Sequence, residues 1–432
     1  MERQYKDSGI EWIGIIPKTW AIERMKGLFI ERNERNCKGR TLLSVSQYFG
    51  IRPKSETDIA DSHIAESYDD YKEVYQGDFV MNIMLAWNGS YAVSEYDGMV
   101  SPAYCVFKFR KDCCKKYFHY LLRTNGYPTA FKTMSRGVID SRLRLYPEQF
   151  YTFPVIIPSV DEQQRISDYL DAKCGEIDSL IALQEQMIEK LKAYKQSIIT
   201  EAVTKGLNPN AKLVPSGIDW IGNIPEGWEI NKLFNLCTIK GRVGWKGLRS
   251  DEFKENSYAY LVTGQDFVSS DINWNNCYQI DKDRYEEDPY IQLSNGDILV
   301  TKDGTIGKIA KVSGMDKPAC LNSGIFVLKQ RKETFFQDYL YWYLSSPLLL
   351  RYNTFINTGG TTIIHLYQNV FERFSMIIPP MDEQIAIASY LDKKCSEIDN
   401  LIVIKQQKIE KLKDYKKSVI YEAVTGKIHI DS

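Results

Sequence analysis

Basic side chains cluster at two places in this sequence, each shortly after a tryptophan, Trp20 or Trp228. Lysine and arginine bind DNA phosphates, and interleaved glycines let a loop follow the backbone of the duplex. A charge run is more often a solvated surface, but its recurrence at equivalent places favours DNA contact. The clusters are Arg24, Lys26, Arg32, Arg35, Lys38 and Arg40, and Lys240, Arg242, Trp245, Lys246 and Arg249. From these we predict DNA contacts by Arg32, Arg35, Lys38, Lys240, Arg242, Trp245 and Lys246.

Two pairs of polar segments resemble exposed loops. Residues 85–90 of the first half pair with residues 301–305 of the second, and residues 136–144 pair with residues 358–362. Arginine pairs with guanine, asparagine with adenine, and serine or threonine with phosphate or base. The alternative is that these are ordinary turns. Because the residues differ between the halves, we predict that the two halves recognise different sequences. The candidate residues are Trp87, Asn88, Ser90, Arg136, Arg142 and Arg144, and Lys302, Thr305, Thr358, Thr361 and Thr362.

The motifs of common DNA-modifying enzymes are incomplete. The segment 304–308, Gly-Thr-Ile-Gly-Lys, is too short for a GxxxxGK[ST] phosphate loop. The segment 288–290, Asp-Pro-Tyr, lacks the second proline of the Asp-Pro-Pro-Tyr motif of amino-methyltransferases, and no glycine-rich cofactor motif follows a strand. Val300 stands where a metal-dependent nuclease needs a second carboxylate. We therefore expect a non-catalytic chain without a cofactor of its own.

Composition fits an ordinary globular protein of two or more domains, with 432 residues, 44% hydrophobic content and no apolar run that could span a membrane. The nine cysteines are scattered, and the four histidines form no ligand pair, so we expect no metal site. The formal charge of -1 gives no global indication of nucleic-acid binding. The polar first residues do not resemble a signal peptide, which predicts a cytoplasmic location.

The chain repeats itself. Residues 156–204 align without a gap with residues 377–425 and match at 31 of 49 positions. A second repeat opens each half, since Ser-Gly-Ile-Glu-Trp-Ile-Gly at 8–14 returns as Ser-Gly-Ile-Asp-Trp-Ile-Gly at 216–222. Between these blocks a thinner correspondence relates Gly-Asp-Phe-Val at 77–80 to Gly-Asp-Ile-Leu at 296–299, and Tyr120 to Tyr341. We infer one fold, used twice, with a changed surface.

Each conserved block predicts a long amphipathic helix with one apolar strip. The strip is assigned to Leu170, Ile177, Leu180, Met187, Leu191, Tyr194 and Ile198, widened by Ile181 and Ile188, and to Leu391, Ile398, Leu401, Leu412, Tyr415 and Val419. Polar Gln184 and Lys405 lie on the same seam and would restrict the pairing register. Ser159 and Glu162 predict a capping box, and Gly206 and Gly426 predict the helix ends.

The favoured interpretation is that the two helices pair with each other, through Ile177, Leu191, Ile198, Ile398, Leu412 and Val419. The alternative is that each helix packs only on its own half. Short β-rich runs at 104–109 and 324–328, and helical stretches at 117–122 and 335–344, predict a mixed α/β domain in each half. The expected divisions are a domain at 1–158, a helix at 159–206, a domain at 207–379 and a helix at 380–428.

Three features together resemble the specificity subunits of type I restriction-modification systems. They are the Ser-Gly-Ile-Glu-Trp-Ile-Gly openings, the run Gly-Asp-Ile-Leu-Val-Thr-Lys-Asp-Gly-Thr-Ile-Gly at 296–307, and Ile-Pro-Pro-Met-Asp-Glu-Gln at 378–384. The segment 241–248 is also similar to a stretch found in some target recognition domains of this family. The likeness spans nearly the whole chain, and the two-copy layout is the family's own.

The resemblance implies two target recognition domains, each recognising one part of a gapped double-stranded DNA site, and antiparallel helices that set the gap. It also implies two methyltransferase subunits that carry S-adenosylmethionine, and motor-nuclease subunits for cleavage. None of those activities is expected in this chain. An alternative function that the long helices and near-zero charge permit is a coiled-coil adaptor with two protein- or ligand-binding domains.

Overall fold

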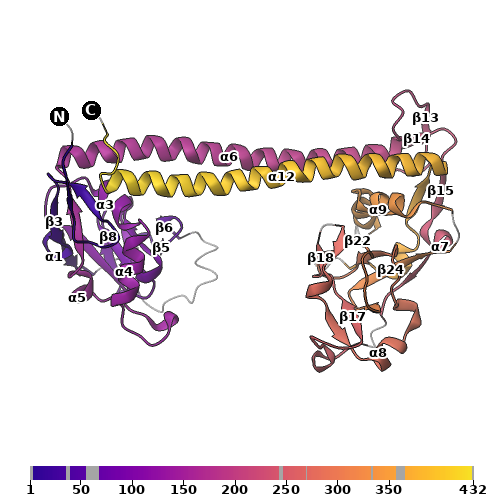
Figure 1. The fold of residues 1–432 in the computed structure, drawn as a ribbon, viewed down its shortest axis with the longest axis horizontal. Helices are drawn as coiled ribbons and strands as arrows, with labels where there is room; N and C mark the ends of the chain where they lie inside the picture. The colour runs from indigo at the N-terminus through magenta and orange to yellow at the C-terminus, as the bar shows by residue number, and fades with distance from the viewer. Residues whose placement is uncertain are drawn as a thin grey trace. The chain divides into compact units, whose positions relative to one another are not determined.

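In the computed structural model the chain forms two compact units (Figure 1). The structure describes residues 3–35, 39–54, 68–242, 247–268, 270–331, 334–356 and 365–430. Unit 1 comprises Met1–Glu185 and Gln406–Ser432, and unit 2 comprises Gln186–Lys405. Each unit therefore contains one α/β domain together with part of both long helices. The candidates Lys38, Trp245, Lys246, Thr358, Thr361 and Thr362 lie outside the described residues.

The centre of unit 1 is an antiparallel four-stranded sheet in the order β4-β11-β8-β9. The strands are β4 (Phe29–Arg32), β11 (Tyr104–Phe109), β8 (Phe79–Asn82) and β9 (Tyr91–Val93). Phe29, Phe79, Phe107 and Phe150 meet on one face of this sheet and are fully buried, which makes an aromatic core. The run predicted at 104–109 is confirmed as β11.

Smaller strand pairs surround this sheet. They are β1 (Tyr5–Asp7) with β2 (Ile15–Pro17), β3 (Ala21–Arg24) with β12 (Pro154–Ile157), β5 (Leu43–Ser46) with β6 (Gly50–Pro53), and β7 (Lys72–Val74) with β10 (Gly98–Val100). The helices of the domain are α1 (Met25–Leu28), α3 (Lys115–Leu122), α4 (Gly126–Met134) and α5 (Pro147–Phe150), with 3-10 turns η1 (Ala86–Asn88) and η2 (Asp140–Arg142).

Unit 2 repeats the central sheet in the same order, β16-β24-β21-β22. These strands are β16 (Cys237–Lys240), β24 (Ile325–Gln330), β21 (Ile298–Thr301) and β22 (Ile309–Lys311). Because β8 follows Gly77-Asp78 and β21 follows Gly296-Asp297, the thin sequence correspondence predicted at these positions is confirmed. Unit 2 adds a three-stranded sheet of β20 (Tyr278–Ile280), β17 (Ala259–Val262) and β23 (Ala319–Leu321), in which β17 and β23 are parallel.

The remaining elements of unit 2 flank these two sheets. The strand pairs are β13 (Leu213–Pro215) with β14 (Asn223–Pro225), β15 (Glu229–Lys232) with β25 (Ser375–Ile378), and β18 (Phe267–Val268) with β19 (Asp271–Ile272). The helices are α7 (Leu233–Leu236), α8 (Lys282–Glu286), α9 (Gln337–Ser345), α10 (Leu348–Ile356) and α11 (Gln368–Phe371), with 3-10 turns η4 (Ser250–Glu252), η5 (Trp274–Asn276) and η6 (Pro289–Ile291). The mixed α/β fold expected for each half is confirmed.

The conserved blocks form the two long helices, α6 (Val160–Lys205) and α12 (Met381–Val424). At the start of α6, Ser159 Oγ accepts a hydrogen bond from the Glu162 amide at 3.3 Å, as a cap does. The Glu162 carboxylate does not complete the predicted capping box, because it accepts a hydrogen bond from Trp20 Nε1 at 2.8 Å instead. Gly206 and Gly426 follow the helix ends with φ of 74° and 69°, the left-handed conformation of a helix stop.

The buried strip of α6 differs in part from the predicted one. It runs through Leu170, Cys174, Ile177, Ile181, Gln184, Ile188, Leu191, Lys195, Ile198 and Ala202, with alternating steps of four and three residues. The strip of α12 is the same set 221 residues later, including Lys405. Leu180, Met187, Tyr194, Leu401 and Tyr415 were predicted to lie on the strip, but they are exposed. The prediction joined two neighbouring faces, and the three-four alternation of a coiled coil separates them.

Within each unit the two helices lie side by side and antiparallel (Figure 1). In unit 2, Lys195 Nζ donates to Asp399 at 2.6 Å, and in unit 1, Lys416 Nζ donates to Asp178 at 2.7 Å. Helix pairing is therefore confirmed as the arrangement of this chain. Of the residues predicted to pair, Ile177, Ile198, Ile398 and Val419 are buried, and Leu191 and Leu412 are half-buried.

Each α/β domain is attached to the start of one helix and to the end of the other. In unit 1, Tyr117 Oη donates to the Val424 carbonyl at 2.9 Å, and in unit 2, Tyr339 Oη donates to the Val203 carbonyl at 3.3 Å. Since Val203 and Val424 are equivalent in the repeat, Tyr117 and Tyr339 are equivalent too. The predicted match of Tyr120 with Tyr341 is therefore shifted by one residue, and Tyr120 corresponds to Trp342.

Candidate nucleic-acid interface

The first candidate loop of unit 1 connects β8 to β9. Trp87 Nε1 donates to the Met84 carbonyl at 3.1 Å, which holds the indole against the loop. Asn88 Oδ1 accepts from both the amide and the hydroxyl of Ser90, at 3.2 and 2.7 Å. Gly89 has φ of 92°, a conformation that an L side chain would strain. Asn88 and Ser90 thus shape the loop, and Ser90 is buried.

The second candidate segment of unit 1 lies beside the first. Arg136 and Arg144 exchange two backbone hydrogen bonds of 2.9 Å, which close residues 136–144 into a loop with Arg136 and Arg142 exposed and Arg144 half-buried. The Leu145 amide donates to the Ile83 carbonyl at 2.9 Å and joins this loop to the β8–β9 connection. We name residues 83–90 with 136–145 loop pair 1.

Lys132 connects the two loops of loop pair 1 through its side chain. Lys132 Nζ lies 5.1 Å from the centre of the Trp87 ring and donates to Asp140 Oδ2 at 2.7 Å. The ammonium group therefore contacts one residue from each of the two loops. A cation over an aromatic face and an exposed ion pair are each worth about 0.5–1 kcal/mol, so this link orients the loops without fixing the fold.

The corresponding loop of unit 2 connects β21 to β22. Thr301 Oγ1 donates to the Thr305 carbonyl at 2.6 Å and accepts from the Lys308 amide at 2.9 Å, which closes a tight loop. Lys302 is half-buried with its Nζ 5.1 Å from the Phe326 ring centre, and Thr305 is exposed. The two candidates Lys302 and Thr305 are thus positioned by Thr301, a residue that the sequence analysis did not select.

The second segment of unit 2 is joined to this loop in the same way as in unit 1. The Leu366 amide donates to the Lys302 carbonyl at 3.1 Å. In addition, the His365 ring contacts the Asp303 carboxylate. We name residues 302–308 with 365–367 loop pair 2. The described part of the chain therefore contains two loop pairs, built on equivalent strands and joined by equivalent backbone hydrogen bonds.

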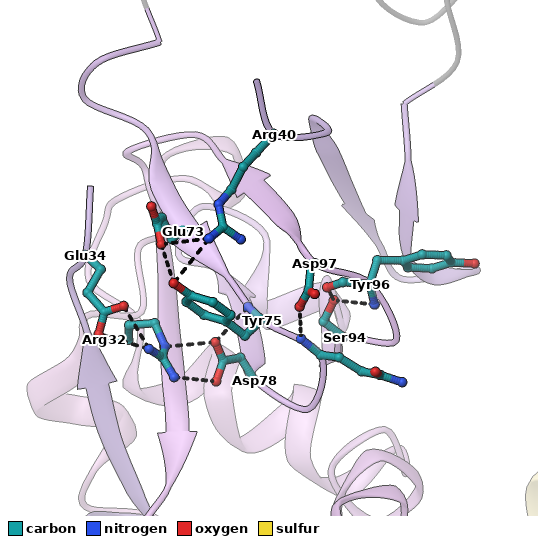
Figure 2. Close-up of polar contacts among 10 residues, drawn as sticks. Arg32, Glu34, Arg40, Glu73, Tyr75, Asp78, Ser94, Tyr96 and Asp97 are labelled. Atoms are coloured by element: carbon teal, nitrogen blue, oxygen red, sulfur yellow. Dashed lines mark hydrogen bonds and ion pairs between the residues drawn. The ribbon is translucent and has the colours of Figure 1, made fainter. Parts of the chain in front are cut away.

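Three basic residues of the first cluster pair with carboxylates within unit 1, and Figure 2 shows two of them, Arg32 and Arg40. Arg32 is largely buried and pairs with Asp78 and Glu34, each at 2.9 Å. Burial raises the pKa of Asp78, while its hydrogen bonds with Tyr75 and Arg32 act in the opposite direction. Arg40 pairs with Glu73 at 3.3 Å. Arg35 is more exposed and pairs with Asp70 at 3.2 Å.

The second basic cluster is divided between the surface and the interior of unit 2. Lys240 is half-buried, with its Nζ 5.6 Å from the Tyr290 ring centre. Arg242 is only 2% exposed, and its guanidinium donates to the Leu321 carbonyl at 2.9 Å. A DNA contact by Arg242 was predicted from charge and spacing. In this structure the buried side chain instead holds β23 through its hydrogen bond to Leu321.

Three residues that the sequence analysis passed over therefore connect the loops, namely Lys132, Asp303 and His365. One signal in the sequence could have indicated His365. The ungapped repeat extends upstream of residue 156, since Leu145-Tyr146 matches Leu366-Tyr367, and Phe150 and Phe153 match Phe371 and Phe374. This longer alignment places His365 at the position of Arg144 and marks it as part of the second loop pair.

The described ranges also bear on metal binding and on membrane insertion. No three His, Cys, Asp or Glu side chains there are grouped as metal ligands would be. None of the helices in the same ranges combines the length and apolar character needed to cross a lipid bilayer.

The chain shares its sequence pattern and fold with known proteins. Residues 225–414 match the family described as type I restriction modification DNA specificity domain. The type I restriction enzyme MjaVIII specificity subunit of Methanocaldococcus jannaschii is 25% identical over 96% of this chain and 94% of its own length. The EcoBI specificity subunit of Escherichia coli is 21% identical over 82% of this chain and 74% of its own length.

Solved structures agree on the fold. A chain from a study of complex assembly and conformational transition of the type I R-M system has a TM-score of 0.71 at 17% identity, covering 96% of this chain and 99% of that chain. The HsdS subunit of Thermoanaerobacter tengcongensis has a TM-score of 0.53 at 16% identity, covering 96% and 98%. In sequence the chain is thus similar to the specificity subunits of type I restriction-modification systems, and its duplicated domains and paired helices have the fold of the matched structures.

Proposed function

We propose that this chain is the specificity subunit of a type I restriction-modification system and recognises a bipartite double-stranded DNA site, with loop pair 1 contacting one half and loop pair 2 the other. One observation carries the proposal. The same backbone hydrogen bond joins the loops of each pair, from Leu145 to Ile83 and from Leu366 to Lys302, whereas the side chains on the loops differ. A shared frame with different polar groups suits two domains that recognise different bases.

The proposed contacts are those candidates whose side chains reach the surface. In loop pair 1 they are Arg136 and Arg142, which are exposed and suited to guanine or phosphate. In loop pair 2 they are Lys302 and Thr305. Arg32 and Arg242 act through the fold instead, because their guanidinium groups are engaged with Asp78 and with the Leu321 carbonyl.

The paired helices are proposed to set the gap between the half-sites. Helix α6 has 46 residues, which at a rise of about 1.5 Å per residue gives about 69 Å of continuous helix. Antiparallel pairing holds both helices in one register, through the polar pairs Lys195–Asp399 and Lys416–Asp178 as well as the apolar strip. A fixed register gives a fixed gap.

The proposed partners are two methyltransferase subunits, which supply S-adenosylmethionine, and motor-nuclease subunits that join for cleavage. Support comes from apolar side chains that remain exposed on both helices at equivalent positions of the repeat. Leu180, Leu183 and Tyr194 on α6 match Leu401, Ile404 and Tyr415 on α12, with exposed fractions of 44–59%. Exposed apolar groups at repeated positions suit two copies of one partner. The complex would act on double-stranded DNA in the cytoplasm.

The test is to sequence the sites methylated by the chain together with a methyltransferase subunit of its family. We expect one gapped motif, and gel shifts with that motif should show binding that single-base changes in either half weaken. Binding that depends on salt but never on sequence would contradict the proposal. Methylation of a continuous motif would contradict the assignment of the helices as spacer.

A further inference from the structure

The contact between His365 and Asp303 is a feature of unit 2 that has no equivalent in unit 1. His365 Nδ1 contacts the Asp303 carboxylate, and the imidazole packs against the Tyr367 ring at a centroid distance of 4.6 Å. Both partners reach the surface, with side chains 33% and 44% exposed. At the equivalent positions unit 1 has Arg144 and Met84, which cannot form such a pair.

Asp303 lies where the β21–β22 loop leaves its fixed base. Backbone hydrogen bonds hold that base, from Thr301 to the Lys308 carbonyl at 3.0 Å and from Lys302 to the Gly324 carbonyl at 2.9 Å. Asp303 and Thr305 follow on the exposed part of the loop. The His365 contact adds a side-chain restraint at this point, between the two candidate contact residues Lys302 and Thr305.

We propose that His365 is a positioning residue for the second half-site, which holds the Lys302–Thr305 loop, through Asp303, in the conformation that contacts the bases. The inference rests on the proposed function of loop pair 2. Holding a loop in its bound conformation lowers the entropic cost of binding. Because a displaced loop cannot align its hydrogen-bonding groups with base edges, the contact also governs discrimination between bases.

Unit 1 obtains a comparable restraint from different residues. Lys132 contacts both Trp87 and Asp140 and so links the two loops of loop pair 1. Each unit therefore serves as the experimental control for the other. Removing Asp303–His365 should affect the second half-site alone, and removing Lys132–Asp140 should affect the first alone.

The experiment uses the full chain with its methyltransferase partners and DNA duplexes that carry the methylated motif or single-base changes in one half. We expect His365→Ala and Asp303→Asn each to weaken binding about tenfold, equivalent to about 1.4 kcal/mol. Both should reduce discrimination at the second half-site and leave discrimination at the first unchanged. The double variant should bind no worse than either single variant, since one contact is lost in all three. Asp140→Asn is the matched control, with the opposite half-site affected.

Exchange of the two side chains, in the variant Asp303→His with His365→Asp, should restore discrimination at the second half. A merely structural role for His365 would not be rescued in this way. Equal effects on both half-sites, additive effects of the two single variants, or unchanged discrimination would overturn the inference. If the unsubstituted chain itself fails to distinguish the motif from its single-base variants, the proposed function fails instead.

Discussion

Lys195 Nζ of helix α6 lies 2.6 Å from Asp399 Oδ2 of helix α12, and this ion pair occurs twice. Adding the repeat offset of 221 residues to Lys195 gives Lys416, and adding it to Asp178 gives Asp399. Lys416 Nζ indeed lies 2.7 Å from Asp178 Oδ1. Exposed ion pairs contribute little to stability, about 0–1 kcal/mol each. These ion pairs instead specify the register of the two helices, because the same pair can form twice only in one antiparallel alignment.

The apolar strip, rather than these ion pairs, should hold the helices together. Replacing both Leu191 and Leu412 with aspartate places a charge on the half-buried seam in each unit. We expect a loss of about 2–4 kcal/mol of unfolding free energy per site, and a larger radius of gyration in small-angle scattering. The matched control is Leu180→Asp with Leu401→Asp, whose side chains are on the same helices but 44% and 47% exposed. Equal unfolding free energies and equal radii of gyration for the two double variants would contradict the assignment of Leu191 and Leu412 to the seam.

Gln163 should be essential for the attachment of the first domain to its helix. It is 1% exposed, accepts from the Cys114 amide and donates to the Pro158 carbonyl, both at 2.9 Å. Gln384 makes the same two bonds in unit 2. Gln163→Leu leaves two buried groups unpaired, and we expect a loss of about 2–4 kcal/mol in chemical denaturation. The exposed neighbour Gln164→Leu is the control. A loss below 1 kcal/mol for Gln163→Leu would contradict this role.

Much of the fold could be predicted because the sequence contains two copies of the same unit. The two long helices and the correspondence of Gly77-Asp78 with Gly296-Asp297 follow from matching segments, and the helix stops at Gly206 and Gly426 follow from glycine itself. The site could be predicted less well from the sequence. Arg32 and Arg242 are basic in the sequence, but their burial depends on partners distant along the chain, Asp78 and Leu321.

The positioning residues were missed for a related reason. Lys132 and Asp303 are unremarkable in type and spacing, and only the fold brings Lys132 to Trp87 and Asp303 to His365. The incorrect assignment of residues to the buried strip of the long helices has a different origin. Leu180 and Tyr194 have the apolar character of strip residues, and their exposure reflects a second, outer face of the helix that sequence periodicity alone did not separate from the first.

His119 should make the stability of unit 1 depend on pH. Burial, with Arg123 and Lys116 nearby, lowers the pKa of His119 to about 4. The unfolded chain has the usual histidine pKa of about 6.5, so it binds the proton more tightly than the folded chain between pH 4 and 6.5. Stability contributed by the neutral ring is therefore present above pH 6.5 and is lost as pH falls towards 4, by about 1–3 kcal/mol.

The measurement is thermal unfolding of the chain at a series of pH values. His119→Tyr is the variant of choice, since Tyr341 occupies the equivalent position in unit 2. This variant should reduce the dependence of the unfolding temperature of unit 1 on pH between pH 6.5 and 4. His429→Gln, a substitution outside the domain core, serves as control. An undiminished pH dependence in His119→Tyr would show that other groups are responsible.

The coiled-coil register predicts how the gap can be engineered. A seven-residue insertion in each helix keeps the alternation of three and four residues and lengthens the pair by about 10.5 Å. We expect the methylated motif to gain about three base pairs in its gap, at about 3.4 Å per pair, with both half-sites unchanged. Four-residue insertions, about one helical turn, should change the gap by a smaller amount and also leave the half-sites unchanged. An unchanged gap after the seven-residue insertions would contradict the role of the helices as spacer.

The central claim is that two domains on one frame recognise two different half-sites independently. The most direct measurement replaces residues 207–376 with the corresponding domain of another specificity subunit and sequences the methylated sites, with the unsubstituted chain in parallel. We predict that one half of the motif changes to that of the donor while the other half and the gap remain. Changes in both halves, or in neither, would contradict the claim.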